Sequence, residues 1–377
     1  MKGSAAMADP KTAKIAFDGA LGPMFRLFFV NLALTIVTLG IYSFWAKTRV
    51  RRYLLSHTEL LGDRLEYTGT GGELFRGFVF AVLGVFLPAA LIVAAFQIGV
   101  GPTAGAIAQG VVVLAFLMLI PLAQFTGARY RLSRTQWRGV RFALDGSPVV
   151  YALKAFVQRI IVIATLGIAT PQAVLALERY RLDRIAFGDL RGRLNAHWRE
   201  APWLSWILPL AVTIALIGLY IGGVVFALAQ AGTVETSPEA QSLMLRLMLD
   251  YGEVLQYLPF LVIGLIILAP ILFVWHQARF IRFLCTRWGL RGAERDRWVA
   301  IYPPQSPGAY VRLLIGNYLI ILFTFGLGAP IVWRRSMRFL TRFILVNAET
   351  MEDAAQSALS KPRQGEGLLS GFDVGVV

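Results

Sequence analysis

The sequence predicts an all-α membrane protein of the multi-pass kind, with four helices that cross the bilayer. Hydrophobic residues make up 56% of the 377-residue chain and charged residues 16%, whereas soluble domains carry about 25% charged residues. No Asp, Glu, Lys or Arg occurs in 77–128, 201–234 or 254–278. Because a crossing helix needs roughly 20 apolar residues, the first run holds two spans and the others hold one each. The predicted spans are Phe78–Ile98, Ile107–Phe125, Leu204–Leu228 and Leu258–Trp275.

Three further apolar segments are nearly long enough to cross, and the loop charges favour one of two topologies. If all seven segments cross, the two faces carry 18 and 13 Lys and Arg residues; if only four cross, the faces carry 30 and 1. Short cytoplasmic loops normally hold an excess of positive charge. We therefore expect four crossings, both termini cytoplasmic, and exterior loops at Gly101–Gly105 and Glu235–Glu253. The three remaining segments are Leu27–Ala46, Ile160–Leu177 and Leu313–Trp333.

Each remaining segment contains a similar break. A Thr and a Gly stand two residues apart, beginning at Thr38, Thr165 and Thr324, and an Arg-aromatic pair follows 14 and 15 residues after each Thr. Gly and Pro interrupt helices, and a broken helix at membrane depth needs protein or a wet cavity around it. We interpret the segments as re-entrant helix–break–helix hairpins, and a kinked full span is the alternative. The Arg-aromatic pairs are Arg52-Tyr53, Arg179-Tyr180 and Arg338-Phe339.

Short strands are expected in the cytoplasmic linkers. Five stretches combine β-branched or aromatic residues with a nearby Gly or Pro, which is typical of a strand that ends in a turn. They are KIAFDG from Lys14, RLEYTG from Arg64, VRFALDG from Val140, RIAFGD from Arg184 and WVAIYPP from Trp298. Each precedes a segment that enters from the basic face, so the chain divides as a tandem internal repeat, an arrangement common in transporters.

The repeat gives five regions. Residues 1–14 form an N-terminal cytoplasmic segment, and 15–147 form the first repeat of a re-entrant segment and two spans. Residues 148–297 form the second repeat, and 298–347 form a third half-repeat with one re-entrant segment. Residues 348–377 lack any apolar period and are expected to be a disordered tail.

No catalytic or metal-binding pattern stands out, so we expect neither an enzyme nor a cofactor. The three histidines are scattered and there is one cysteine, which argues against a metal site. The Gly69–Gly72 run lacks the Lys of a phosphate loop, and we interpret it as a strand-to-helix turn. His57 with Asp63 is the single pair that an enzyme acting on lipid could use, and we rank this third among the functions.

Polar residues at depth lie in the broken segments. The second half of a hairpin begins deep in the bilayer with free backbone N–H groups and a positive dipole end, so three such ends that meet would suit an anion or a dipolar solute. The alternative is that Thr and Gly only allow close helix packing. The candidate solute-lining residues are Asn31, Thr38, Gly40, Thr165, Gly167, Asn317, Thr324 and Gly326.

Basic residues cluster beside two of the breaks. The net charge of +15 is explained by contact with acidic lipid headgroups on the cytoplasmic face, and we expect no binding of nucleic acid. A vestibule that attracts anions would use the same residues. The candidate headgroup or anion ligands are Lys47, Arg49, Arg51, Arg52, Arg334, Arg335 and Arg338.

Two stretches carry a resemblance to a known family. TLGIYSFWAKTRVRRYLLSHTELLGDRLEYTGTGGELFRGF from Thr38, followed by ARYRLSRTQWRGVRF from Ala128, resembles the bacterial YjgN-like family. The likeness extends roughly from Ile15 to Val346, although the second copy has Pro171-Gln172 where the first has Phe44-Trp45. The resemblance implies a location in the bacterial cytoplasmic (inner) membrane and a broad topology, and the family has no known activity to carry over.

The sequence therefore favours a transporter or channel for a small solute, with an anion as the leading class. The alternative is a non-transporting membrane protein that binds acidic lipids or a partner through its basic cytoplasmic face. Self-association into a homo-oligomer is compatible with either function.

Overall fold

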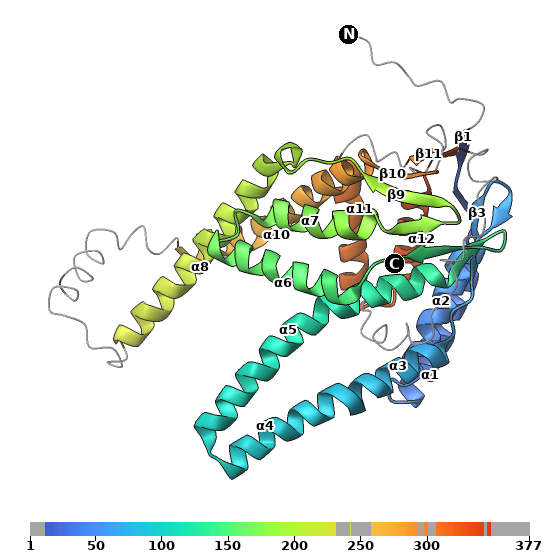
Figure 1. Ribbon diagram of the computed structural model, residues 1–377. Coiled ribbons are helices and arrows are strands. Elements are labelled where there is room, and N and C mark those ends of the chain that lie inside the picture. Colours follow the sequence, from blue (N-terminus) through green and yellow to red (C-terminus); the bar gives the residue numbers. More distant parts are fainter. Residues whose placement is uncertain are drawn as a thin grey trace, which may run out of the picture.

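The computed structural model describes residues 12–230, 242, 258–292, 298–300, 307–342 and 345–347. Short strands gather at one end of the molecule, and the long helices α4, α5 and α8 extend away from that end (Figure 1). The expected exterior loop at 235–253, except residue 242, and the expected tail from residue 348 lie outside the described residues.

Four helices in the described residues are long and apolar enough to cross a membrane, as the sequence predicts. The first pair is joined at Gly101, whose φ of 125° suits glycine, and α4 packs on α5 as α8 packs on α10. The first crossing helix contains a short π-helical segment. The four are Gly71–Gly99, which consists of α3 (Gly71–Ala81), Val82–Phe86 and α4 (Leu87–Gly99), then α5 (Pro102–Ser133), α8 (Trp203–Gln230) and α10 (Leu258–Cys285).

The Gly69–Gly72 run forms the predicted strand-to-helix turn. The Thr70 hydroxyl accepts a hydrogen bond from the Glu73 N–H, and the Glu73 carboxylate accepts one from the Thr70 N–H, which is a complete capping box. Gly71 is buried, and a Cβ there would lie 2.7 Å from the Cα of Trp45. The absence of a side chain at residue 71 therefore allows α3 to pack closely on the helix that carries Trp45.

Each of the three further apolar segments forms two helices that fold back on each other, so the predicted helix–break–helix geometry is present. The legs of each hairpin pack together. The first hairpin is α1 (Leu21–Val37) and α2 (Ser43–Ser56), the second is α6 (Pro148–Ala164) and α7 (Thr170–Leu182), and the third is α11 (Pro307–Phe323) and α12 (Ala329–Thr341).

The three breaks share one turn geometry. In the first, Leu39 and Gly40 have φ values of 50° and 91°, and the Gly40 N–H bonds to the Thr35 carbonyl across the helix end at 2.8 Å, as in a Schellman motif. The Thr38 hydroxyl donates to the Leu34 carbonyl and accepts from the Tyr42 N–H at 2.9 Å. Equivalent bonds occur around Thr165 and Thr324.

The Arg-aromatic pair links the first and second hairpins to neighbouring backbone. Arg52 and Arg179 each donate to a backbone carbonyl 17 residues later, at Gly69 and Ala196. Tyr53 and Tyr180 each donate to a carbonyl 33 residues earlier, at Ala20 and Ser147 respectively. Burial raises the pKa of Tyr53, so its phenol stays protonated and able to donate.

The strands form antiparallel sheets, and all five predicted strands are present. A seven-stranded sheet has the order β11-β10-β9-β8-β7-β6-β5, a three-stranded sheet has the order β2-β3-β4, and β1 pairs with β12. The strands are β1 (Thr12–Lys14), β2 (Ala16–Phe17), β3 (Thr58–Leu60), β4 (Asp63–Arg64), β5 (Glu66–Tyr67), β6 (Thr135–Trp137), β7 (Val140–Leu144), β8 (Ile185–Phe187), β9 (Leu190–Leu194), β10 (Trp288–Arg291), β11 (Trp298–Ala300) and β12 (Leu345–Asn347).

The helices pack in a closed cycle. Each contacts the next in the order α1, α2, α3, and then α4, α5, α6, α7. A hydrogen bond joins the second hairpin to α8, and α8, α10, α11, α12 and α1 then pack in turn. The two ends of the chain complete the cycle, because Thr12 pairs with Asn347 between β1 and β12 and Phe28 stacks edge-on against Trp333.

We predict that Gly71→Ala destabilises the protein, because the new Cβ would meet the backbone of Trp45. Overpacking of this kind costs about 1–3 kcal/mol, which would appear as a lower melting temperature in detergent. Gly72→Ala is the matched control, since nothing lies within 4 Å of a Cβ at that position. Equal melting temperatures for the two variants would contradict the close approach of α3 and α2.

Candidate functional site

The second hairpin lies between the two pairs of crossing helices. Its first leg α6 packs on α5, and the turn between α6 and α7 reaches α8, where the Trp206 indole N–H donates to the Gly167 carbonyl at 2.9 Å. Figure 1 shows α6 and α7 running from α5 to α8. The hairpin therefore contacts both pairs and is a natural centre for a functional site.

One charged side chain of this hairpin binds deep on a crossing helix. Arg159 donates to the Leu117 carbonyl of α5 at 2.5 Å. That carbonyl lacks its usual helical donor, because Pro121 stands four residues later and proline has no N–H. From the sequence, Arg159 is expected in a linker that precedes an apolar segment starting at Ile160; in the structure it lies within α6, which begins at Pro148.

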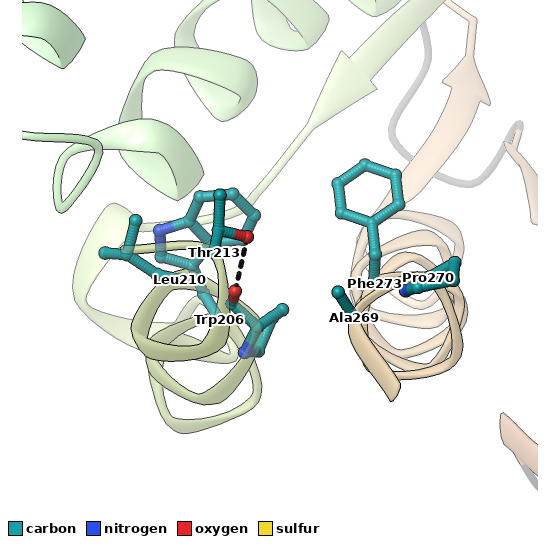
Figure 2. A pocket seen from close by; sticks show the side chains of 7 residues that line it. Trp206, Leu210, Thr213, Ala269, Pro270 and Phe273 are labelled. Carbon is teal, nitrogen blue, oxygen red and sulfur yellow. Dashed lines mark hydrogen bonds between the residues drawn. The ribbon is translucent and has the colours of Figure 1, made fainter. Parts of the chain in front are cut away.

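A cavity of about 260 Å³ lies beside the turn of the second hairpin, between α8 and α10. In Figure 2, Trp206, Leu210 and Thr213 face Ala269, Pro270 and Phe273 across it. The Thr213 hydroxyl donates to the Pro209 carbonyl at 2.7 Å, so the lining presents mainly apolar groups. The Trp206 ring lines this cavity and at the same time holds the hairpin turn.

A buried polar pair sits next to Trp206. Ser205 is 1% exposed and His276 is 5% exposed, and the Ser205 hydroxyl lies 3.0 Å from Nδ1 of His276. Ser205 also donates to the Pro202 carbonyl, and the His276 ring lies 5.1 Å from the Trp206 ring. The pair joins α8 to α10 near the cavity, and the sequence did not predict this contact.

A carboxamide occupies the same position in all three hairpins. Asn31, Gln158 and Asn317 each stand seven residues before the Thr of the turn. Asn31 is 5% exposed and Asn317 is 8% exposed. Among the residues that the structure describes, each of the three has a buried side-chain oxygen without a hydrogen-bond partner, and the Asn31 nitrogen also lacks one. The Asn317 nitrogen donates to the Ser336 hydroxyl at 3.1 Å. The Gln in the second copy concealed this equivalence in the sequence.

The other candidate solute-lining residues are used to build the turns. The hydroxyls of Thr38, Thr165 and Thr324 each accept a hydrogen bond from the N–H four residues later. These N–H groups were expected to be free to bind an anion, and they are not. Nothing lies within 4 Å of a Cβ built at Gly40 or Gly326, whereas one at Gly167 would meet Leu210. The three turns therefore do not meet at these glycines, and a solute-lining role for them stays a prediction.

The candidate headgroup ligands differ in exposure and in their contacts with the protein. Arg49, Arg52, Arg335 and Arg338 are exposed, and Arg49 lies over the Tyr42 ring. Arg51 is buried at 7% exposure, Arg52 bonds to the Gly69 carbonyl, Arg334 bonds to the Gly19 carbonyl and Lys47 has an interaction within the protein. Several of the predicted ligands thus have structural contacts as well.

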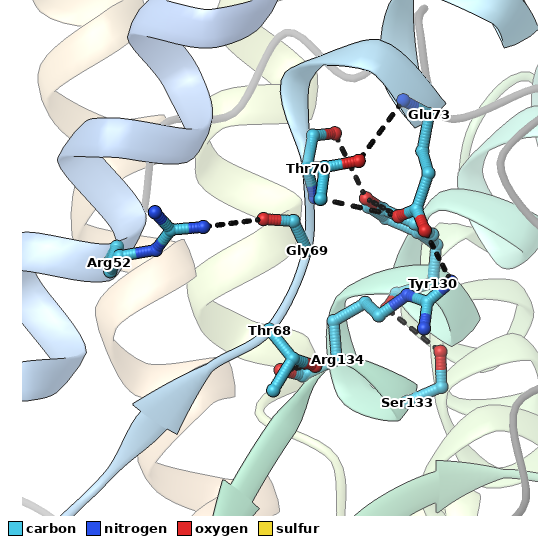
Figure 3. A network of polar contacts seen from close by, with 8 residues as sticks. All are labelled: Arg52, Thr68, Gly69, Thr70, Glu73, Tyr130, Ser133 and Arg134. Carbon is cyan, nitrogen blue, oxygen red and sulfur yellow. Dashed lines mark hydrogen bonds and ion pairs between the residues drawn. The ribbon is translucent and has the colours of Figure 1, made fainter.

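The base of the first crossing helix holds a polar network (Figure 3). Glu73 accepts from the Tyr130 hydroxyl and from Arg134, both at 2.7 Å. These bonds join the start of α3 to the end of α5, and Arg52 reaches the same turn from the first hairpin. His57 and Asp63, the candidate pair for an enzyme, have other partners, since His57 contacts the Tyr53 carbonyl and Asp63 pairs with Arg138.

Comparison with known proteins places the chain in a family. Residues 12–370 match the family described as bacterial protein of unknown function, DUF898. The chain belongs to this family. The protein named inner membrane protein YjgN from Escherichia coli O157:H7 is 34% identical over 139 residues, or 37% of this chain. The protein of that name from Salmonella typhimurium is 32% identical over 133 residues.

The matched segments cover about a third of each relative, 33% for the Escherichia coli protein and 31% for the Salmonella protein. No solved structure matches the chain. The resemblance to the YjgN-like family that the sequence motifs indicated is thereby confirmed. Neither the family description nor the names of these relatives states an activity.

We predict that Trp206→Phe loosens the turn of the second hairpin, because it removes the donor to the Gly167 carbonyl. Loss of one such bond costs about 1 kcal/mol. Hydrogen exchange of residues 165–169 should become faster in detergent. Trp275→Phe on α10 is the control, since no hydrogen bond of its indole occurs within the described part of the chain. Equal exchange in the two variants would show that Trp206 does not hold the turn.

Proposed function

We propose that this protein is a transporter or channel of the bacterial inner membrane for a small solute. The main support is the set of buried carboxamides at Asn31, Gln158 and Asn317, whose side-chain oxygens have no partner. They lie at one repeated position in a closed cycle of helices. A solute that hydrogen-bonds to these groups would satisfy them as it binds.

Buried polar atoms without hydrogen-bond partners reduce the stability of a protein. A buried donor or acceptor without a partner costs about 1–3 kcal/mol, and a leucine of similar size would avoid that cost. Asn31 carries two such atoms at 5% exposure. A polar group that reduces stability is a reasonable candidate for a functional role, since functional sites are where proteins tolerate local costs.

The proposed topology places the three turns within the bilayer as re-entrant hairpins, with both termini in the cytoplasm. Each turn presents a large apolar side chain outward: Leu39 is 93% exposed, Leu166 is 76% exposed and Phe325 is 95% exposed. Lipid would cover such side chains, whereas water would not. The shared turn geometry also supports the proposed tandem repeat, with 15–147 and 148–297 as its two copies. The names of the relatives support an inner-membrane location.

The alternative is a non-transporting protein that binds acidic lipids or a partner through its basic face. The exposed side chains of Arg49, Arg335 and Arg338 favour it, because basic residues beside a membrane attract acidic headgroups. On this view the carboxamides would be structural. Substitution of the carboxamides separates the two functions, because only in a transporter would solute flux depend on them.

We predict that Asn31→Leu and Asn317→Leu abolish solute flux while the melting temperature stays equal or rises. The reason is that leucine removes the polar atoms that bind solute and also the buried groups without partners. Purified protein in liposomes would be tested with a panel of labelled anions and neutral polar solutes, and unfolding would be followed in the same lipid.

The exposed Gln172→Leu is the control for this experiment, because it makes a similar change on the second leg of a hairpin. Absence of flux for every solute with the natural sequence would contradict transport. Co-purified acidic phospholipid in that case would favour the alternative. A large loss of stability in Asn31→Leu would instead indicate that the carboxamide has a structural role.

We predict that nitroxide labels at residues 39, 166 and 325 are accessible to oxygen but shielded from a water-soluble nickel reagent, as expected for lipid-covered turns. Each label would be attached to a single cysteine in a Cys285→Ser background. Single cysteines at the exposed positions Glu59 and Arg193 should react with an impermeant maleimide from the cytoplasmic side, and a cysteine at the exposed position Thr103 should react from the outside. Strong nickel contact at the three turns would contradict re-entry.

A further inference from the structure

The most unusual charge in the described structure is Arg159. It contacts Leu117, which stands 12 residues before Arg129 in α5, or ~18 Å along the helix axis at 1.5 Å per residue. Leu117 also lies well inside the charge-free run 77–128. With α5 as a crossing helix in the proposed topology, the guanidinium lies near the middle of the hydrocarbon layer, where a charged side chain is costly and often marks a binding site or a pathway.

The protein positions this guanidinium with a single backbone carbonyl. Pro121 has no N–H to give to the Leu117 carbonyl, and Arg159 fills that vacancy. A guanidinium has five N–H donors in a fork that fits carboxylate or phosphate oxygens. The bond to the Leu117 carbonyl uses one donor, and it is the single contact of Arg159 with a polar atom in the part of the chain that is described.

No carboxylate neutralises Arg159 among the described residues. The nearest ion pair on this hairpin is internal to α7, where Arg181 and Glu178 lie 2.6 Å apart. The Arg159 side chain is half-buried, so its remaining donors are open to a ligand. A fixed cation with free donors and no counter-charge, in a medium of low dielectric constant, attracts an anion strongly.

We infer that Arg159, held by the carbonyl that Pro121 leaves free, binds the oxyanion group of a ligand within the membrane between α5 and α6. The ligand carries a phosphate or carboxylate group, supplied either by a small soluble anion or by an acidic lipid headgroup. With a soluble anion, the inference rests on the proposed transport function and names its substrate class. The anion preference then comes from this arginine, since the N–H groups of the hairpin turns are already bonded.

The test measures binding and needs no flux. Protein in nanodiscs of neutral phosphatidylcholine would be titrated with labelled inorganic phosphate. We expect Arg159→Gln to weaken binding by at least about tenfold, which corresponds to ~1.4 kcal/mol. Lys154→Gln removes the same charge from the same helix, at an exposed position beside the Tyr180 ring, and should bind phosphate within about twofold of the natural protein.

Two further variants keep the test informative if Arg159→Gln fails to fold. Arg159→Lys keeps the charge but lacks the fork, so we expect intermediate binding. Pro121→Ala returns an N–H to the Leu117 carbonyl, which frees Arg159 from its anchor and should weaken binding while every charge is retained. Phosphate binding that is the same in all four variants and the natural protein, or absent from the natural protein, would overturn the inference.

The source of the oxyanion is decided by adding phosphatidylglycerol to the nanodiscs. Competition with phosphate in the natural protein but not in Arg159→Gln would assign the site to a lipid headgroup. Unchanged phosphate binding would assign it to a soluble anion. Flux of a neutral solute without phosphate binding would contradict this inference and leave the transport proposal standing. Phosphate binding without any flux would support this inference and contradict the transport proposal.

Discussion

The structure depends on how the chain reverses direction without leaving backbone groups unpaired. An N–H or carbonyl without a partner is costly wherever water is excluded, and each hairpin turn pairs these groups largely with its own residues. A threonine hydroxyl accepts from the N–H four residues later, and a glycine in the left-handed region bonds back across the end of the first helix. These bonds are internal to each turn, the second turn also accepts a bond from Trp206 of α8, and the outer position of each turn carries an exposed leucine or phenylalanine.

The same rule explains the contact between the second hairpin and α5. A proline inside a crossing helix creates an unpaired carbonyl, and here the missing donor comes from another segment. The interaction is specific because only a long cationic side chain at that height on α6 can reach it. It joins the second hairpin to α5 at the turn that contains Pro121. At the C-terminal end of α5, hydrogen bonds from Tyr130 and Arg134 to Glu73 join the two crossing helices of the first pair.

Sequence patterns predicted the elements that depend on local chemistry. The charge-free runs predicted the four long apolar helices, and the Thr-x-Gly spacing predicted the positions of the three breaks. Strands such as β9 and β10 were missed because glycine and arginine in Leu190–Leu194 and Trp288–Arg291 do not favour strands by themselves. The start of α6 was misplaced because Lys154 and Arg159 read as linker charges, and their partners, the Tyr180 ring and the Leu117 carbonyl, are set by tertiary packing. Gln158 was missed because it shares the carboxamide group and the position of Asn31 and Asn317 but is a different residue type.

Closure of the cycle has a consequence for biosynthesis. Of the described elements, β1 and α1 leave the ribosome before the other helices, and their neighbours α12 and β12 follow after all the remaining helices. Until α12 arrives, the face of α1 that holds Met24 and Phe28 has no partner from the third hairpin. The first hairpin must therefore remain without this partner until the third hairpin is made, so that assembly is completed by a contact between segments far apart in the sequence.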